Sequence, residues 1–158
     1  MSANIVYIIS DNVFNDQFTE CLSGIIESML DEYDLSGGEV SVIIGDNELL
    51  QNLNRQYRNK DAATDVLSFS YLESKDQNLP YEEVAVGDIY ISLEKVRENS
   101  EEAGHSLKKE TALLTIHGML HLLGFSHDEE IAAERMQVIE RELLCKYDHA
   151  LTGGETGV

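Results

Sequence analysis

The chain has 158 residues, of which 42% are hydrophobic and 26% are charged, a composition typical of a globular protein with a sizeable core. Its 30 acidic residues outnumber its 11 basic residues, and the formal net charge is −19. This charge argues against broad, non-specific binding of nucleic acid, which depends on a basic stripe. No apolar run could span a bilayer, and no basic segment precedes the first apolar stretch, so we expect neither membrane contact nor secretion.

Two cysteines, Cys21 and Cys145, lie far apart in the sequence and form no CxxC motif. We expect both to be reduced, semi-buried thiols of a cytoplasmic protein, because stable disulfides belong to oxidising compartments. No linker or internal repeat divides the chain, so residues 1–150 are predicted to form a single domain. The glycine-rich end, residues 151–158, is predicted to be a disordered tail.

The predicted elements alternate between short strands and amphipathic helices. Apolar runs predict strands, and apolar residues at helical spacing predict helices. The expected strands are 5–9, 39–44, 66–71 and 84–92. The expected helices are 15–32, 46–57, 93–103, 106–123 and 129–147. Residues 73–83 are polar and contain the only proline, so they are predicted to be a mobile surface loop. This order predicts a small mixed sheet of four strands with helices packed on it and with the third strand at an edge.

Three histidines near the end of the fourth predicted helix form the most informative pattern of the chain. His117, His121 and His127 occur in the spacing H-x-x-x-H-x-x-G-x-x-H. Residues four apart on a helix lie on the same face, so His117 and His121 can point at one metal ion. Gly124 is the residue type that ends a helix in a left-handed conformation, which lets the chain turn and bring His127 to the same ion. Three ligands leave one tetrahedral position open, as in catalytic zinc sites.

The alternative is that these histidines are ordinary core residues of an apolar helix. Buried imidazoles without partners would be costly, and either a shared metal ion or two separate hydrogen bonds would remove that cost. Three of the five histidines occur at this spacing, which favours the metal. Imidazole ligands suit zinc, although nickel, copper and iron also accept them.

Position 118 distinguishes this motif from that of zinc peptidases. The H-E-x-x-H peptidases carry a glutamate directly after the first histidine, as general base for the attacking water. Here the position is occupied by Gly118, which has no side chain. The pattern therefore indicates either a peptidase relative that lost its base, or an ion used for a reaction that depends more on charge stabilisation.

Three segments, residues 54–69, 87–92 and 117–127, carry sequence blocks that occur together in one known family. They read N-x-x-Y-R-x-x-D-x-x-T-D-V-L-S-F, G-D-I-x-I-S and H-G-x-L-H-L-x-G-x-x-H, in this order. Together they resemble the YbeY family, the bacterial endoribonucleases associated with ribosomal RNA maturation. The resemblance implies an α+β fold of the zincin kind, with ribosomal partners.

Two positions depart from the family pattern. Ala63 stands where the family usually has proline, a change that should mainly loosen a loop. Ser126 stands where the family usually has aspartate, a residue that could orient a metal ligand or take part in proton transfer. Asp128, directly after His127, is the candidate substitute, although it should point in another direction.

Arg58 is the predicted catalytic residue. The family pattern carries an arginine at this position, directly after Tyr57. A guanidinium offers a fixed fork of donors to phosphate oxygens and keeps its proton. Judged on the residues alone, a solvated charge at a helix end is the simpler interpretation, because cations are favoured there.

Two carboxylates have open roles. Asp65 could be a turn or cap residue. Alternatively, it could act as a general base or accept a hydrogen bond from a metal-binding histidine. Glu110 lies two turns before His117 on the same helix face and could reach water in the same cleft. The simpler expectation for Glu110 is a first-turn residue favoured by the helix dipole.

The histidine spacing predicts a metal site, and the resemblance to the YbeY family implies a zinc-dependent endoribonuclease that cuts single-stranded RNA in ribosomal RNA maturation and ribosome quality control. One Zn²⁺ held by His117, His121 and His127 would activate water, or the 2′-hydroxyl of the RNA would attack the phosphate, while Arg58 stabilises the developing charge. Two alternatives stay open. One is a ribosome-assembly factor with a purely structural metal, and the other is a metal-dependent hydrolase of another substrate, such as a peptide.

The expected partners are RNA, in particular ribosomal RNA, and a ribosomal protein; neither DNA nor a membrane is expected. An acidic surface suits a basic ribosomal protein, which could deliver the RNA. RNA binding would then be confined to a few local cations. These are Arg55, Arg58, Lys60, Lys108 and Lys109.

Overall fold

The sheet sets the frame of the molecule. The computed structural model describes residues 4–10, 13–72, 85–124 and 130–147. Within them, four strands form one sheet in the order β1-β2-β4-β3. The strands are β1 (Ile5–Ile9), β2 (Glu39–Gly45), β3 (Val66–Ser70) and β4 (Ala85–Ser92). Parallel pairing joins β1 to β2 and β2 to β4, while β3 pairs with β4 antiparallel. The third strand is therefore an edge strand, as predicted.

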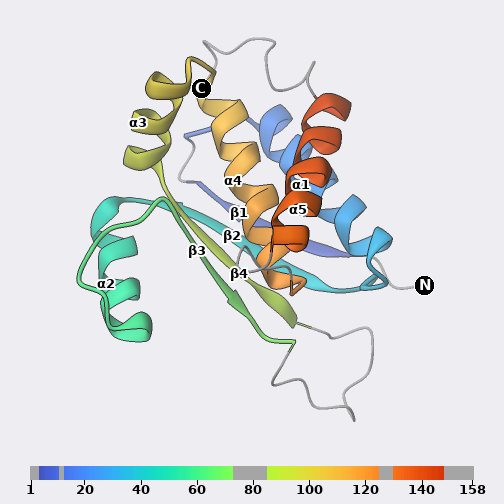
Figure 1. Ribbon diagram of the computed structural model, residues 1–158, viewed down its shortest axis with the longest axis horizontal. Coiled ribbons are helices and arrows are strands. Elements are labelled where there is room, and N and C mark those ends of the chain that lie inside the picture. The colour runs from blue at the N-terminus through green and yellow to red at the C-terminus, as the bar shows by residue number, and fades with distance from the viewer. Residues whose placement is uncertain (1–3, 11–12, 73–84, 125–129, 148–158) are drawn as a thin grey trace.

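Five helices pack on this sheet within the described residues. They are α1 (Asp16–Glu32), α2 (Asn47–Arg58), α3 (Leu93–Ala103), α4 (Leu107–Leu122) and α5 (Glu130–Lys146). Four of them begin at a polar residue whose side chain accepts a hydrogen bond from a first-turn N–H, the usual way to satisfy a helix start. These caps are Asn15, Asp46, Ser92 and Ser106. Figure 1 shows α1, α4 and α5 on one side of the sheet and α2 on the other.

The main core lies between the sheet and the α1, α4 and α5 layer. From β2, Val40, Val42 and Ile44 point into it, because alternate residues of a strand share one face. The apolar face of α1 is buried in the same core; its buried residues are Phe18, Leu22, Ile25, Ile26, Met29 and Leu30. α4 contacts α1, α3, α5, β3 and β4, so it is enclosed on most sides. This burial fixes the position of the histidine-bearing helix.

The α+β architecture, the mixed four-stranded sheet and the five helices confirm the predicted fold, and the element bounds agree within two residues. One expectation was wrong: Cys145 is exposed, not semi-buried. It lies two residues after the buried Leu143, which turns it to the outer face of α5. Cys21 is half-buried, and burial raises the pKa of its thiol. The predicted loop 73–83 and tail 151–158 lie outside the described residues.

The helices that the structure describes include none that is both long enough and apolar enough to cross a bilayer.

Candidate metal centre and active site

His117 and His121 lie side by side one turn apart on α4, as their spacing predicts. Their ring centroids are 5.0 Å apart, and the ring planes are inclined at 66°. Most residues of α4 are buried, yet the side chain of His117 is 29% exposed and His121 is exposed. The two imidazoles therefore reach solvent from a helix that is otherwise largely enclosed.

Gly118 lies where α4 comes closest to the sheet. A Cβ added there would lie 2.9 Å from Cγ2 of Ile89 and 3.0 Å from Oγ of Ser68. The Ser68 hydroxyl also donates a hydrogen bond to the Gly118 carbonyl at 3.3 Å. Any side chain at this position would press on β3 and β4 from its Cβ onward, so the packing disfavours a glutamate there.

The end of α4 follows the prediction made from Gly124. The helix ends at Leu122, and Gly124 adopts a φ of +98°, in the left-handed region. Its N–H donates to the carbonyl of His121 at 3.1 Å. His127 and Asp128 lie outside the described residues, so the third metal ligand and its acidic neighbour remain predictions.

His117 has a partner that the sequence reasoning missed. Its Nδ1 lies 2.9 Å from Oε1 of Glu140, on α5, and the Glu140 side chain is only 16% exposed. A sequence signal exists for this contact. Glu140 shares one face of α5 with Met136 and Leu143, both buried, and a carboxylate in an apolar stripe needs a polar partner.

A cavity of about 460 Å³ opens beside the two imidazoles. Its walls come from α4, from β3 and the residue before it, and from the end of α2. The lining residues are Arg58, Asp65, Val66, Leu67, Ser68, His117 and His121. Its volume falls within the range of small-ligand sites. The cavity thus brings together all four predicted site residues that the structure describes.

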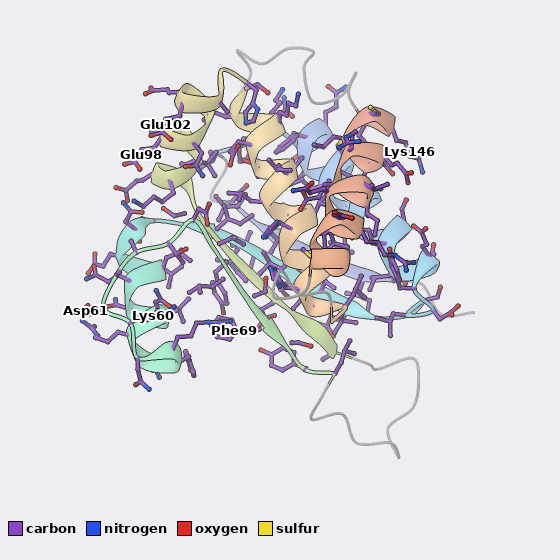
Figure 2. The ribbon with its side chains drawn as sticks, in the orientation of Figure 1. Lys60, Asp61, Phe69, Glu98, Glu102 and Lys146 are labelled. Carbon is purple, nitrogen blue, oxygen red and sulfur yellow. The ribbon has the colours of Figure 1, made fainter. Side chains whose placement is uncertain are left out.

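Arg58 is the last residue of α2, which ends at Asn59 with a left-handed φ of +56°. Nη2 of Arg58 donates to the carbonyl of Ser68 at 2.9 Å, and its Cζ lies 5.5 Å from the centroid of the Phe69 ring. Figure 2 shows Phe69 on the α2 side of the sheet. The Arg58 guanidinium is exposed but hydrogen-bonded to Ser68, which lines the cavity, so it is more than a solvated charge at a helix end.

The Ser68 carbonyl that accepts from Arg58 faces the open edge of the sheet. Tyr71 donates its N–H across to the carbonyl of Val86 on β4 at 3.0 Å. Alternate residues of an antiparallel pair make such bonds, so the backbone groups of Ser68, three residues earlier, point away from β4. Arg58 therefore covers part of this edge.

Asp65 is anchored by a chain of hydrogen bonds. Nδ2 of Asn99 donates to Oδ2 of Asp65 and to Oε2 of Glu110, both at 3.2 Å. The other Glu110 oxygen lies 2.6 Å from Nε2 of His105. Glu110, in the first turn of α4, is 5% exposed. It is therefore a buried member of this hydrogen-bond network and does not line the cavity.

Three aromatic rings form a row next to Arg58. The centroids of Tyr57 and Phe69 are 5.4 Å apart, and those of Phe69 and Tyr90 are 5.8 Å apart, both in edge-on arrangements. Tyr57 is 61% exposed. An aromatic cluster thus lies beside Arg58, with the Tyr57 ring open to solvent.

The donor chemistry fits a divalent ion. Two imidazoles face one cavity, and one of them has a carboxylate at its other nitrogen, as metal-bound histidines usually have. Among the side chains that the structure describes, no cluster of three or more potential ligands occurs. His117 and His121 would supply two ligands, and the predicted third, His127, falls in the undescribed segment 125–129.

The fold and the cavity define a class: small α+β proteins whose candidate active site lies between an edge strand and a histidine-bearing helix. Comparison with known proteins makes the assignment specific. The chain belongs to the endoribonuclease YbeY family, whose model matches residues 6–148.

Individual relatives agree with this assignment. Endoribonuclease YbeY of Carboxydothermus hydrogenoformans is 47% identical over 107 residues, which cover 68% of this chain and 71% of the relative. The protein of that name from Caldicellulosiruptor saccharolyticus is 42% identical over 149 residues, covering 87% and 89%. The solution structure of TM1509 from Thermotoga maritima matches with a TM-score of 0.60 at 25% identity, covering 91% of this chain and 92% of that one.

Proposed function

We propose that this protein is a zinc-dependent endoribonuclease that cuts single-stranded RNA during ribosomal RNA maturation and ribosome quality control. Membership of the endoribonuclease YbeY family supports the reaction class. The observation that carries the proposal for this chain is the shared cavity, which is lined by Arg58, Asp65, His117 and His121. A cationic fork, a carboxylate and a pair of metal-type donors are groups that can carry out phosphodiester cleavage together.

His117, His121 and His127 would hold the ion. When bound, a divalent ion acts as a Lewis acid that lowers the pKa of water and offsets charge on a phosphate oxygen. Arg58 has five N–H donors, and its contact with the Ser68 carbonyl leaves others to bind the non-bridging oxygens in the transition state. Asp65, held by Asn99, is the described candidate to take a proton from the attacking oxygen.

Single-stranded RNA is the substrate form that the surroundings favour. The exposed ring of Tyr57 lies beside Arg58, at the end of the aromatic row. Unpaired bases stack on exposed aromatic side chains, whereas the bases of a duplex are already stacked on each other. A phosphate at Arg58 would bring a neighbouring base near Tyr57.

The charge distribution fits delivery of the RNA by a partner. The net charge of −19 disfavours non-specific capture of RNA, and a basic ribosomal protein would complement it. Figure 2 shows Glu98 and Glu102 projecting outward from α3, away from Phe69. The two free thiols, Cys21 and Cys145, suit the reducing cytoplasm, where we place the protein.

Substitution of Arg58 tests its assigned role. We expect Arg58→Ala to lower kcat on single-stranded RNA by about 10²- to 10³-fold, as for loss of a transition-state donor, and Arg58→Lys to restore only part of it. The matched control is Arg55→Ala, since Arg55 lies in the same last turn of α2 but pairs with Asp61 outside the cavity. Equal losses in both variants would mean that general charge, and not the cavity position, matters.

Metal removal tests the cofactor. Dialysis against a chelator should abolish cleavage, and added Zn²⁺ should restore it. The product ends then separate the two routes of attack. A 2′,3′-cyclic phosphate, with resistance of a substrate that is 2′-deoxy at the cut site, identifies the RNA hydroxyl as nucleophile. Full activity of chelated protein that elemental analysis finds free of metal would refute the metal-dependent mechanism.

A ribosome-assembly factor with a structural metal is the second candidate, favoured by the acidic surface. Single alanine variants of His117 and His121 discriminate between the two. Folded variants that no longer cut RNA support catalysis, whereas unfolding of both, with an inactive native protein, supports the assembly factor. Peptide hydrolysis is disfavoured because Gly118 stands in place of the peptidase glutamate and the packing there disfavours a side chain.

A further inference from the structure

The contact between His117 and Glu140 joins the candidate metal centre to α5. The two residues are 23 positions apart in the sequence, and Nδ1 of His117 lies 2.9 Å from Oε1 of Glu140. Glu140 lies between Met136 and Leu143 on the face of α5 that packs inward. Its carboxylate is therefore held on a packed helix and not on a mobile surface chain.

The contact determines which nitrogen of His117 carries the hydrogen. An ionised carboxylate can only accept hydrogen bonds, so the ring must donate from Nδ1. In a neutral imidazole, hydrogen on Nδ1 means that Nε2 has the lone pair. The opposite tautomer would place two acceptors against each other at 2.9 Å. The contact thus favours the form that binds a metal through Nε2.

We propose that Glu140 is a positioning residue of the metal centre, which holds His117 in the Nδ1–H tautomer and fixes the plane of its ring. This inference rests on the proposed metal site, because His117 must be a ligand for its tautomer to matter. Carboxylates that orient metal-bound histidines in this way typically contribute a factor of about 10 to 100 to metal affinity. Glu140 is no catalytic residue, since it does not line the cavity.

Zinc affinity, measured by competition with a chromophoric chelator, provides the first test. We expect Glu140→Leu to weaken Zn²⁺ binding by about 10- to 100-fold. Glu140→Gln keeps an oxygen that can accept from Nδ1–H, so it should retain most of the affinity. Glu134→Leu is the control, because Glu134 is an exposed glutamate of the same helix. His117→Ala supplies the reference for loss of a ligand.

Nitrogen NMR of the metal-free protein provides a readout that does not depend on zinc. The spectra of the native protein and of the variants are recorded at one and the same alkaline pH. We expect the His117 ring to be protonated on Nδ1 in the native protein and to shift towards the Nε2–H form in Glu140→Leu. A purely structural contribution of Glu140 would change thermal stability without changing this ratio.

The outcomes separate this inference from the proposed function. If His117→Ala binds zinc like the native protein, the proposed metal site itself is wrong. If His117→Ala loses zinc while Glu140→Leu binds it normally, only the role of Glu140 is refuted. An Nε2–H tautomer in the native protein would also refute that role, and it can be read even if Glu140→Leu does not fold.

Discussion

At the scale of single residues, Gly118 explains why α4 has no side chain directly after its first histidine, His117. Gly118 lets α4 lie against Ile89 of β4 and Ser68 of β3 with less space than a methyl group needs. The helix thereby gains close packing on the sheet and loses the possibility of a side chain at the position where zinc peptidases keep their base. Sequence comparison alone would describe this as a missing residue, whereas the structure gives it a steric reason.

Gly118→Ala should destabilise the protein by about 1 to 3 kcal/mol, because the added methyl group overpacks the contact with the sheet. Urea denaturation followed by circular dichroism measures the change. Gly24→Ala is the matched control, since a Cβ at Gly24 in α1 would meet its nearest atom, the Tyr147 hydroxyl oxygen, at an ordinary 3.7 Å. There we expect a gain of up to about 1 kcal/mol from helix propensity. Equal effects of the two substitutions would contradict the steric account.

Tyr71 should titrate unusually late. Its hydroxyl donates to Oδ2 of Asp88 at 2.6 Å, and this hydrogen bond, with desolvation, raises the pKa of Tyr71 from 10.0 to about 12. Since the folded-state pKa lies above the unfolded value, the stabilisation is complete below pH 10 and is lost as the pH rises towards 12. Ring carbon NMR shifts measure the titration. Asp88→Asn should return the pKa of Tyr71 towards its ordinary value, and an unchanged midpoint would rule out Asp88 as the cause.

At the scale of elements, the end of α2 and the edge strand β3 together position the predicted catalytic arginine. Asn59 stops the helix in a left-handed conformation one residue after Arg58, so the arginine occupies the last turn, next to β3. The carbonyl of Ser68 then receives its guanidinium. A local backbone conformation thus determines the geometry of a site built from two distant elements.

Asn59→Val should destabilise the protein by about 1 to 2 kcal/mol, because a β-branched residue strongly disfavours a φ of +56°. Asn59→Gly tolerates that conformation and should be close to neutral. Urea denaturation gives the stabilities. If the helix end positions Arg58, RNA cleavage should also fall in the valine variant at temperatures where it is still folded, while the glycine variant keeps its activity. Full cleavage by folded Asn59→Val would show that Arg58 does not depend on this helix end.

The elements were predictable because their signals are local. Asp46 and Ser106 mark helix starts, Gly124 marks a helix end, and apolar runs mark the strands. The hydrogen bonds that hold the site residues in place could not be predicted in the same way. Glu140 acts on His117 from another helix, and Asn99 joins carboxylates that come from different elements. Such contacts depend on how elements pack, which no local spacing specifies.

At the scale of the whole molecule, the net negative charge disfavours binding of the predicted substrate, RNA, which is itself negatively charged. The net charge is −19, and Lys108, one of the cations expected near the site, is buried, with 4% exposure. The exposed cations closest to the cavity in sequence and fold are Arg55, Arg58 and Lys60, at the end of α2. Affinity for RNA must then come from few phosphate contacts, with stacking and the metal centre supplying the remainder.

RNA binding should therefore depend only weakly on salt. Three phosphate contacts at about −0.7 each for a single strand give a slope of about −2 in a plot of log K against log salt concentration. Fluorescence anisotropy with a labelled single strand, at several potassium chloride concentrations, measures this slope. Lys60→Ala should make it shallower by about 0.7. A slope much steeper than about −2 would mean that further lysines or arginines of the chain contact phosphate and would contradict this account.

The bond between Arg58 and Ser68 has a further consequence, for how copies of the protein behave towards one another. The outer border of β3 offers backbone groups that a strand from another molecule could pair with, which is a common route to aggregation. Arg58 occupies one of these carbonyls and places a positive charge beside it. Arg58, the predicted catalytic residue, thus also disfavours strand pairing between molecules, and we expect Arg58→Ala to be less soluble than the native protein.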